Sequence, residues 1–152
     1  MKALLFLVSL TLVGTCFGVM RKCHFHIDIP AIKYAFDGFA YVDDTPPYHI
    51  VTLKAPVSAP FNGTIKDDVG SSHPTSGKLS IADPPIEHLN DVMVGGTYFP
   101  EKVTYNGKFM INPLDITKKE VPVKGNVKLS NGKQGDATGS IENFMTGQCK
   151  RA

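Results

Sequence analysis

Two histidines spaced one residue apart form the densest group of chemically active side chains in the sequence. His24 and His26 lie in the stretch CHFHIDIP, close to Cys23 and Asp28. Alternate residues of a β-strand point to the same side, so a strand would present both imidazoles to one zinc or copper ion. A metal site needs a third and a fourth ligand, however, and the other histidines are scattered singly. We therefore predict that both imidazoles lie on the solvent face of a strand, with a zinc or copper site at His24 and His26 as the less favoured alternative.

The sequence carries no motif for nucleophilic catalysis or for phosphate binding. It has no G-x-S-x-G nucleophile elbow. The stretch GSSHPTSGKL is similar to a phosphate loop only superficially, because its glycines are wrongly spaced and Leu79 follows the lysine where serine or threonine is required. We interpret this stretch as a solvated loop. The expectation is a protein that is not an enzyme and uses no cofactor.

The first residues have the pattern of a secretory signal peptide, predicted to span residues 1–18. Lys2 precedes an apolar run from Ala3 to Val13, and small residues end the segment at Gly18. The apolar run is too short to span a bilayer. We therefore expect cleavage after Gly18 and one secreted, extracellular domain over residues 19–152, in an oxidising environment.

The remaining cysteines and one sequon predict two covalent modifications of this domain. Cleavage would remove Cys16 and leave Cys23 and Cys149, one near each end. An even pair in a secreted protein is most simply interpreted as one disulfide, with two free thiols or a bridge between chains as the alternatives. The sequon Asn62-Gly63-Thr64 predicts N-glycosylation at Asn62.

Positive charge is concentrated in the C-terminal part of the domain. Residues 19–95 hold six basic and nine acidic residues, whereas residues 96–152 hold nine basic and five acidic. This excess, which includes Lys118 and Lys119, would favour anionic lipid head groups or glycans, and a solvated strand face is the alternative. A transient contact with a membrane surface fits this pattern. A nucleic acid partner does not, because no basic tract is interleaved with aromatic residues.

Apolar and polar residues alternate with period two along most of the domain, which predicts half-buried antiparallel strands. In KYAFDGFAYV the large residues change phase around Gly38. Tyr34 and Phe36 precede the change, and Phe39 and Tyr41 follow it. We expect a bulge or kink at Gly38, where the inward face of the strand switches.

Turn signals separate the predicted strands. Asn106-Gly107 and Asn131-Gly132 predict hairpins, because a type I′ turn needs positive φ at both central residues. A short helical turn is expected near residues 84–93, where a proline follows a capping aspartate. About seven to eight short strands with almost no helix predict one all-β domain, a sandwich or a barrel, and we expect a monomer.

The C-terminal half resembles the closing strands of the ML lipid-recognition family, which contains ganglioside activator, the Niemann–Pick type C sterol carrier and mite group 2 allergens. The similar features are a G-x-Y strand start at residues 96–98, a strand at residues 109–111, and the pattern V-x-V-x-G-x-V-x-L at residues 121–129 before a glycine turn. The segment PPIEHLNDVM also resembles the loop-helix segment of ganglioside activator. The chain departs from the family in keeping only two cysteines beyond the leader.

This resemblance implies an immunoglobulin-like antiparallel β-sandwich whose two sheets part to hold one lipid or sterol, without catalysis. Inward side chains would line the cavity: Phe36, Phe39, Tyr41, Val51, Leu53, Tyr98, Phe99, Phe109, Ile111, Val121 and Val123. Lys118 and Lys119 would hold an anionic head group at its mouth.

Two functions therefore stay open. The first is a secreted lipid- or sterol-binding or lipid-transfer protein, and the second is a closed-core structural or interaction module that acts through its surface. An apolar cavity on the order of several hundred Å³ would favour the first. A core packed to ordinary density would favour the second.

Overall fold

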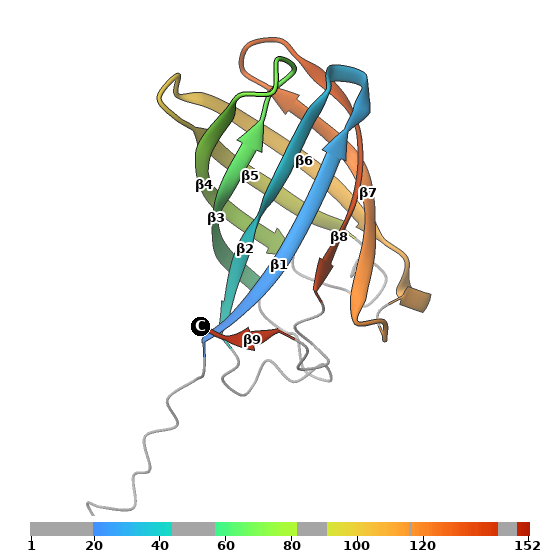
Figure 1. The fold of residues 1–152 in the computed structure, drawn as a ribbon. Helices are drawn as coiled ribbons and strands as arrows, with labels where there is room; N and C mark the ends of the chain where they lie inside the picture. Colours follow the sequence, from blue (N-terminus) through green and yellow to red (C-terminus); the bar gives the residue numbers. More distant parts are fainter. Residues whose placement is uncertain (1–19, 44–56, 82–90, 116, 143–148) are drawn as a thin grey trace, which may run out of the picture.

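The computed structural model describes residues 20–43, 57–81, 91–115, 117–142 and 149–152, which form a barrel of antiparallel strands (Figure 1). The strands are β1 (Met20–Ile29), β2 (Tyr34–Asp43), β3 (Val57–Lys66), β4 (Ser72–Ile81), β5 (Asp91–Tyr98), β6 (Val103–Ile111), β7 (Glu120–Leu129), β8 (Gln134–Glu142) and β9 (Lys150–Arg151). Two short 3-10 helices, η1 (Pro30–Ile32) and η3 (Pro113–Asp115), lie in the connections. Within these ranges no helix has the length and apolar character needed to cross a membrane.

Strands β1 to β8 close into a barrel in which each strand pairs with the next one in the sequence. The order runs from β2 through β8 to β1, and β1 also pairs with β2. The pairing of β8 with β1, from Phe25 opposite Ile141 to Asp28 opposite Thr138, closes the circle. The predicted immunoglobulin-like sandwich is therefore wrong. A sandwich keeps two separate sheets, whereas this chain forms one sheet that curls back onto its first strand.

The predicted face switch at Gly38 is also wrong. The pairing of β1 with β2 runs without a bulge from Met20 opposite Asp43 to Ile29 opposite Tyr34. Gly38 instead pairs with Gly63 of β3, and a Cβ on either glycine would clash with the backbone of the neighbouring strand. Glycine at inward positions of a strand permits the tight bends that a small barrel needs. Gly38 therefore serves the curvature of the sheet and leaves the alternation of β2 unbroken.

One of the two predicted hairpins is confirmed, although its turn is not type I′, because Gly132 has a positive φ and Asn131 does not. The turn at Asn131-Gly132 joins β7 to β8: Gly132 has a φ of 89°, and its N–H donates to the Leu129 carbonyl at 3.1 Å. The pair Asn106-Gly107 lies inside β6, where a Cβ on Gly107 would come within 2.8 Å of the Phe109 ring. At the second site, close packing against an aromatic ring explains the glycine better than a turn does.

Two further interpretations of the sequence differ from the observed structure. The stretch that we interpreted as a solvated loop supplies most of β4, which pairs with both β3 and β5. Of the predicted helical turn at residues 84–93, residues 84–90 lie outside the described part of the chain. Residues 91–93 begin β5.

The predicted disulfide between Cys23 and Cys149 is confirmed, with an S–S distance of 2.03 Å. It lies beside the junction of β1 and β8, which pairs only the residues from Phe25 to Asp28 on the β1 side. The first half of β1 extends past β8, and β9 pairs with it there at Arg21 and Lys22. The disulfide thus ties β9 to the part of β1 that β8 leaves without a partner.

Candidate functional site

The barrel interior contains an apolar cavity of about 70 Å³. Its wall takes side chains from all eight barrel strands, and all of them except Ser140 are apolar: Phe25, Ile27, Ala40, Val42, Ala59, Leu79, Val92, Val94, Phe109, Ile111, Val123, Ser140 and Ile141. Several of these lie at or next to the last positions of β2, β6 and β8, so the cavity is near the end of the barrel where the even-numbered strands finish. We call this the cavity end. With no charged group in its wall, the cavity suits an apolar ligand group.

A second void, of about 20 Å³, shares part of its wall with the first. Phe109 borders both voids and is almost completely buried. Phe36 and Tyr105 border only the smaller void. The interior therefore contains two separate spaces with side chains between them.

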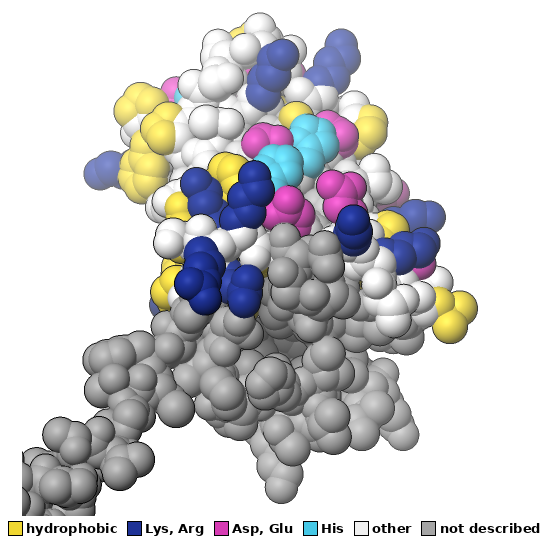
Figure 2. Space-filling view, turned by 60° about the horizontal axis from the view of Figure 1, so that its bottom comes forward, with side chains coloured by type: hydrophobic (Ala, Val, Ile, Leu, Met, Phe, Trp, Pro, Cys, Tyr) yellow, Lys and Arg dark blue, Asp and Glu magenta, His cyan; other side chains and the backbone are white. Residues whose placement is uncertain are grey.

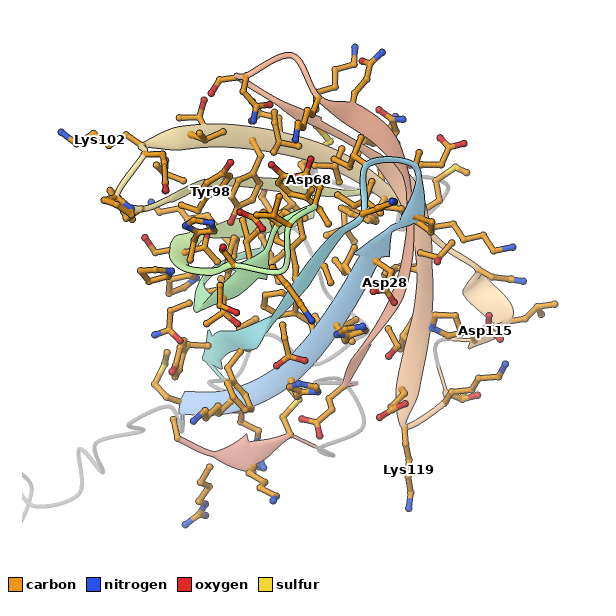
Figure 3. The ribbon with its side chains drawn as sticks, turned by 45° about the horizontal axis from the view of Figure 1, so that its top comes forward. Asp28, Asp68, Tyr98, Lys102, Asp115 and Lys119 are labelled. Atoms are coloured by element: carbon orange, nitrogen blue, oxygen red, sulfur yellow. A yellow bond between two sulfur atoms is a disulfide. The ribbon has the colours of Figure 1, made fainter. Side chains whose placement is uncertain are left out.

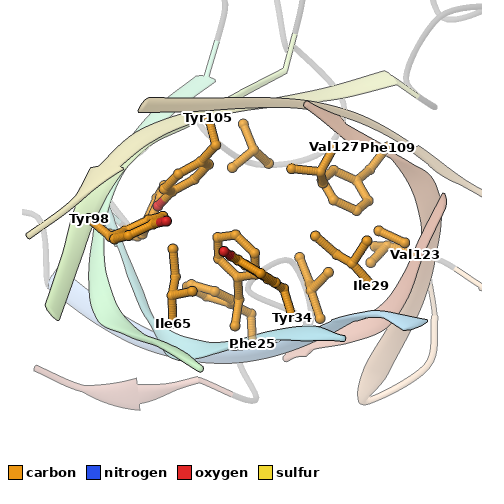
Figure 4. Close-up of a cluster of buried hydrophobic side chains, with 14 of the residues drawn as sticks. Phe25, Ile29, Tyr34, Ile65, Tyr98, Tyr105, Phe109, Val123 and Val127 are labelled. Atoms are coloured by element: carbon orange, nitrogen blue, oxygen red, sulfur yellow. The ribbon is translucent and has the colours of Figure 1, made fainter. Parts of the chain in front are cut away.

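The opposite end of the barrel, which we call the closed end, is filled by tyrosines. Tyr34, Tyr98 and Tyr105 are buried, and their rings project into the interior (Figure 4). Burial raises the pKa of Tyr98, and its hydrogen bond with Tyr34 raises it further. Burial also raises the pKa of Tyr105 to about 12. The phenols of Tyr98 and Tyr105 therefore stay neutral, and the three tyrosine rings fill this end of the barrel.

Thr75 accepts the hydrogen bond of the buried Tyr105 hydroxyl. The Thr75 hydroxyl donates to the Thr97 carbonyl at 2.8 Å, so Tyr105 Oη donates to Thr75 Oγ1 at 2.6 Å. We expect Thr75→Val to lower the free energy of unfolding by about 1–3 kcal/mol, because the Tyr105 hydroxyl loses its acceptor while buried. Tyr105→Phe should cost only about 1 kcal/mol, because Thr75 keeps its own acceptor. Urea denaturation measures both values, and a larger loss for Tyr105→Phe would contradict this order of donors.

His73 lies between two carboxylates at the closed end. Its Nε2 is 2.9 Å from Asp67 Oδ2, and its Nδ1 is 3.2 Å from Glu101 Oε2. The hydrogen bond with Asp67 is the main cause that raises the pKa of His73, and the same bond lowers the pKa of Asp67. Because carboxylates engage both ring nitrogens, the cluster favours a charged imidazolium and has no ring nitrogen left over to act as a base.

Most of the predicted cavity residues that the structure describes face the barrel interior. Those that are buried are Phe36, Tyr98, Phe109, Val121 and Val123, and Ile111 is half-buried against the core. Of this set, Phe109, Ile111 and Val123 border the cavity. Val51 and Leu53 lie outside the described residues.

Phe39, Tyr41 and Phe99, which were also predicted to line the cavity, lie on the outside of the barrel. The Nζ of Lys22 lies 4.0 Å from the centroid of the Phe39 ring. The Tyr41 hydroxyl donates to Asn62 Oδ1 at 3.4 Å, and Phe99 is exposed in the turn after β5. For Phe39 and Tyr41 the error follows from the face switch expected at Gly38: without that switch, these two residues point outwards from β2.

The cavity residues that the sequence prediction missed are mostly small or aliphatic: Phe25, Ile27, Ala40, Val42, Ala59, Leu79, Val92, Val94, Ser140 and Ile141. Strict period-two alternation would have found several of them. In DVMVGGTY, for example, Val92 and Val94 share the phase of the buried Tyr98. The prediction favoured large aromatic residues over the phase of the strand.

His24 and His26 lie on the outer face of β1, where the alternation placed them. His24 Nε2 is 3.1 Å from Asp37 Oδ1, and the two nitrogens of His26 are 3.2 Å from Asp37 and 3.1 Å from Asp28. Figure 2 shows the histidine side chains among Asp and Glu side chains on this face. Within the described ranges, no group of three or more His, Cys, Asp and Glu side chains is arranged to hold a metal ion. The pair therefore forms polar contacts across an exposed strand face.

The remaining predicted site residues are exposed. Lys118 and Lys119 lie in the connection from β6 to β7, at the cavity end, and Lys118 Nζ is 2.6 Å from Asp115 Oδ1. Figure 3 shows Lys119 projecting away from the barrel. Asn62 is exposed on β3, where an oligosaccharide could be attached. The head-group role of the lysines and the glycosylation of Asn62 stay predictions.

Together these features define a closed, eight-stranded, antiparallel up-and-down β-barrel with an apolar cavity at one end. In barrels of this size the interior is just wide enough for side chains to fill it or for one small ligand to bind. No family model matches the chain, and no curated protein matches it. The resemblance to the ML family therefore stays a prediction, although the sandwich that it implied is not the observed fold.

Two solved structures show a similar arrangement of strands. One is EF1p2_mFAP2b bound to DFHBI, which matches with a TM-score of 0.49 and 9% identity over 82% of this chain and 93% of that one. The other is a de novo designed fluorescence-activating β-barrel, with a TM-score of 0.46 and 13% identity over 81% of this chain and 91% of that one. A likeness this distant carries no argument about what the present chain binds.

Proposed function

We propose that the protein is a secreted, non-enzymatic carrier that binds the end of a single acyl chain in the cavity. The main support is the composition of the cavity wall, which is apolar apart from Ser140. The Cys23–Cys149 disulfide supports secretion, because disulfides persist mainly in oxidising compartments.

The cavity volume selects the type of lipid. A volume of about 70 Å³ is well below the ~300–1,000 Å³ of pockets that enclose a drug-sized ligand. It is also below the ~150 Å³ of a cavity that takes one benzene ring. A sterol ring system is therefore too large, whereas the narrow end of an acyl chain is small enough to enter.

The cavity alone provides only part of the affinity that a carrier needs. A water molecule occupies about 30 Å³ of liquid volume, so the cavity accepts on the order of two groups of that size. Two buried methylenes contribute about 1.6 kcal/mol, whereas a Kd of 1 mM already requires about 4 kcal/mol. The rest of the chain must therefore bury apolar surface at the rim of the cavity end. The head group would then point outwards on the side of the barrel where Lys118 and Lys119 lie.

The small cavity also favours the second function, a closed-core module that acts through its surface. Native mass spectrometry of the purified protein separates the two functions. A co-purified fatty acid, together with uptake of a fluorescent fatty acid from solution, supports the carrier. If the protein stays free of ligand and takes up no fluorescent fatty acid, the carrier function is excluded and the surface module is favoured.

Filling the cavity should abolish most of this binding. Ala59 is buried in the cavity wall, and Ala59→Leu adds three carbons to a space of about 70 Å³. We expect the affinity for a fluorescent fatty acid to fall about tenfold or more, because the leucine replaces about two methylenes of ligand. The free energy of unfolding should hold or rise by about 0.5–2 kcal/mol, as is common when a cavity is filled.

The matched control for this variant is Ala35→Leu, which adds the same atoms to the outer face of β2. It should leave fatty acid binding unchanged. Unchanged binding in Ala59→Leu, with its fold intact, would show that the ligand does not enter this cavity.

A further inference from the structure

Four basic side chains meet on two paired strands at the cavity end. In the pairing of β1 with β9, Arg21 lies opposite Arg151 and Lys22 lies opposite Lys150. Like charges directly opposite each other on neighbouring strands destabilise a sheet. The adjacent Cys23–Cys149 disulfide keeps these two strands together in spite of that repulsion. Successive residues of a strand point to opposite sides, so the four side chains form two pairs, Arg21 with Arg151 and Lys22 with Lys150, and together we call them the basic face.

The contacts of the basic face include a backbone carbonyl and an aromatic ring. Arg21 Nη1 donates to the Cys149 carbonyl at 3.1 Å, and the Lys22 ammonium lies over the Phe39 ring. The neighbouring carboxylate of Glu142 accepts a hydrogen bond from the His24 amide at 2.9 Å. Lys150 and Arg151 are exposed at the end of the chain.

The basic face borders the cavity end of the barrel. Arg21 lies directly opposite Val42 in the pairing of β1 with β2, and Val42 is part of the cavity wall. Figure 2 shows Lys and Arg side chains gathered towards this end of the molecule. The basic face therefore lies at the end of the barrel that contains the cavity.

Exposed apolar side chains accompany the charge. Met20, at the start of β1, is 42% exposed, and Leu114, in η3 between β6 and β7, is 83% exposed. Lys118 and Lys119 follow Leu114 in the same connection. Apolar side chains flanked by lysine and arginine are the combination that binds the interface of an anionic membrane, where the apolar groups insert and the cations meet lipid phosphates and carboxylates.

We propose that the basic face docks the cavity end of the barrel onto an anionic lipid membrane. This proposal rests on the carrier function, because docking in this orientation brings the cavity to the surface from which an acyl chain would be taken. The recognised chemistry is that of an anionic phospholipid head group within a bilayer.

Sedimentation with vesicles tests this docking. The purified protein should bind vesicles of phosphatidylcholine with phosphatidylserine and should not bind vesicles of phosphatidylcholine alone. Each basic residue near a membrane surface contributes about fivefold to binding. The double charge reversal Lys150→Glu with Arg151→Glu should therefore weaken binding at least about 25-fold, and added salt should weaken binding of the native protein.

The control is Lys66→Glu with Lys128→Glu, which makes the same change in charge on exposed lysines at the closed end. This variant should keep most of the vesicle binding. Equal losses in the two double variants would overturn the proposal, because net charge alone would then explain the binding. Binding to heparin without binding to vesicles would also overturn it, in favour of an anionic glycan.

Fatty acid uptake from solution separates this proposal from the carrier function. The Lys150→Glu, Arg151→Glu variant should take up a fluorescent fatty acid as well as the native protein does, since neither residue lines the cavity. If the native protein binds anionic vesicles but takes up no fatty acid, the carrier function fails while the docking stands. If it takes up fatty acid but ignores anionic vesicles, the docking fails alone.

Discussion

Replacing both Cys23 and Cys149 with alanine should lower the free energy of unfolding by about 5 kcal/mol. The two residues are 126 apart in the sequence. In the chain-entropy model, a bridge over a loop of that length removes about 4.9 kcal/mol of loop entropy from the unfolded state. A loss of that size equals the whole stability of many small domains. The disulfide is therefore expected to be the largest single contribution to the stability of this barrel.

Without the disulfide, the barrel should open first at the junction of β1 and β8. That junction pairs only the residues from Phe25 to Asp28 with those from Thr138 to Ile141. Urea denaturation of the oxidised and reduced protein measures the loss, and the double alanine variant should match the reduced protein. Hydrogen exchange should rise in β1 and β8 before it rises in β4 and β5. A loss below about 1 kcal/mol would show that the remaining contacts close the barrel without the bridge.

Phe109→Ala should destabilise the protein and strengthen its binding of fatty acid. The Phe109 ring is buried and borders both voids, so its removal should join the spaces of about 70 Å³ and 20 Å³ and add the volume of the ring. A buried Phe→Ala substitution costs about 3–5 kcal/mol. Each further methylene that the enlarged cavity accepts contributes about 0.8 kcal/mol, so the affinity for a long acyl chain should rise about tenfold or more.

The matched control for this substitution is Phe36→Ala. Phe36 is also buried, but it borders only the smaller void. Phe36→Ala should lower the free energy of unfolding by a similar amount, but it should not increase the affinity for fatty acid. Thermal unfolding with and without fatty acid, together with a binding titration, separates the two effects. Equal binding by both variants and the native protein would show that the ligand does not reach Phe109.

The local pattern of this sequence is more informative than its overall architecture. Period-two alternation placed Phe25, Ile27 and Ile29 inwards and the neighbouring histidines outwards, as the structure has them. The cysteine count indicated the disulfide correctly. The same alternation is compatible with a sandwich or a barrel, because both bury one face of every strand. The pairing of β8 with β1 decides between them, and it depends on contacts more than a hundred residues apart.

The errors around glycine have a common physical origin. Gly38 and Gly107 were assigned to a bulge and a turn, which are local conformations that favour glycine. Both lie within strands, where a side chain would collide with Asn62 in one case and with the Phe109 ring in the other. Their role depends on a neighbouring strand or a packed side chain, neither of which a single sequence displays. The misplacement of Phe39 and Tyr41 followed directly from the first of these errors.

The short strand β9 also protects the barrel against association through its strand edges. Closure pairs β1 to β8 into a ring, so among the described residues the sheet order ends at β9. The open side of β9 offers two residues, both cationic, and short edges that carry lysine or arginine discourage a second chain from adding a strand. Reduction of the disulfide would release β9 and uncover the backbone of β1 around Arg21 and Lys22. We therefore expect reduction of this one bond to leave an open strand edge on which aggregates can start.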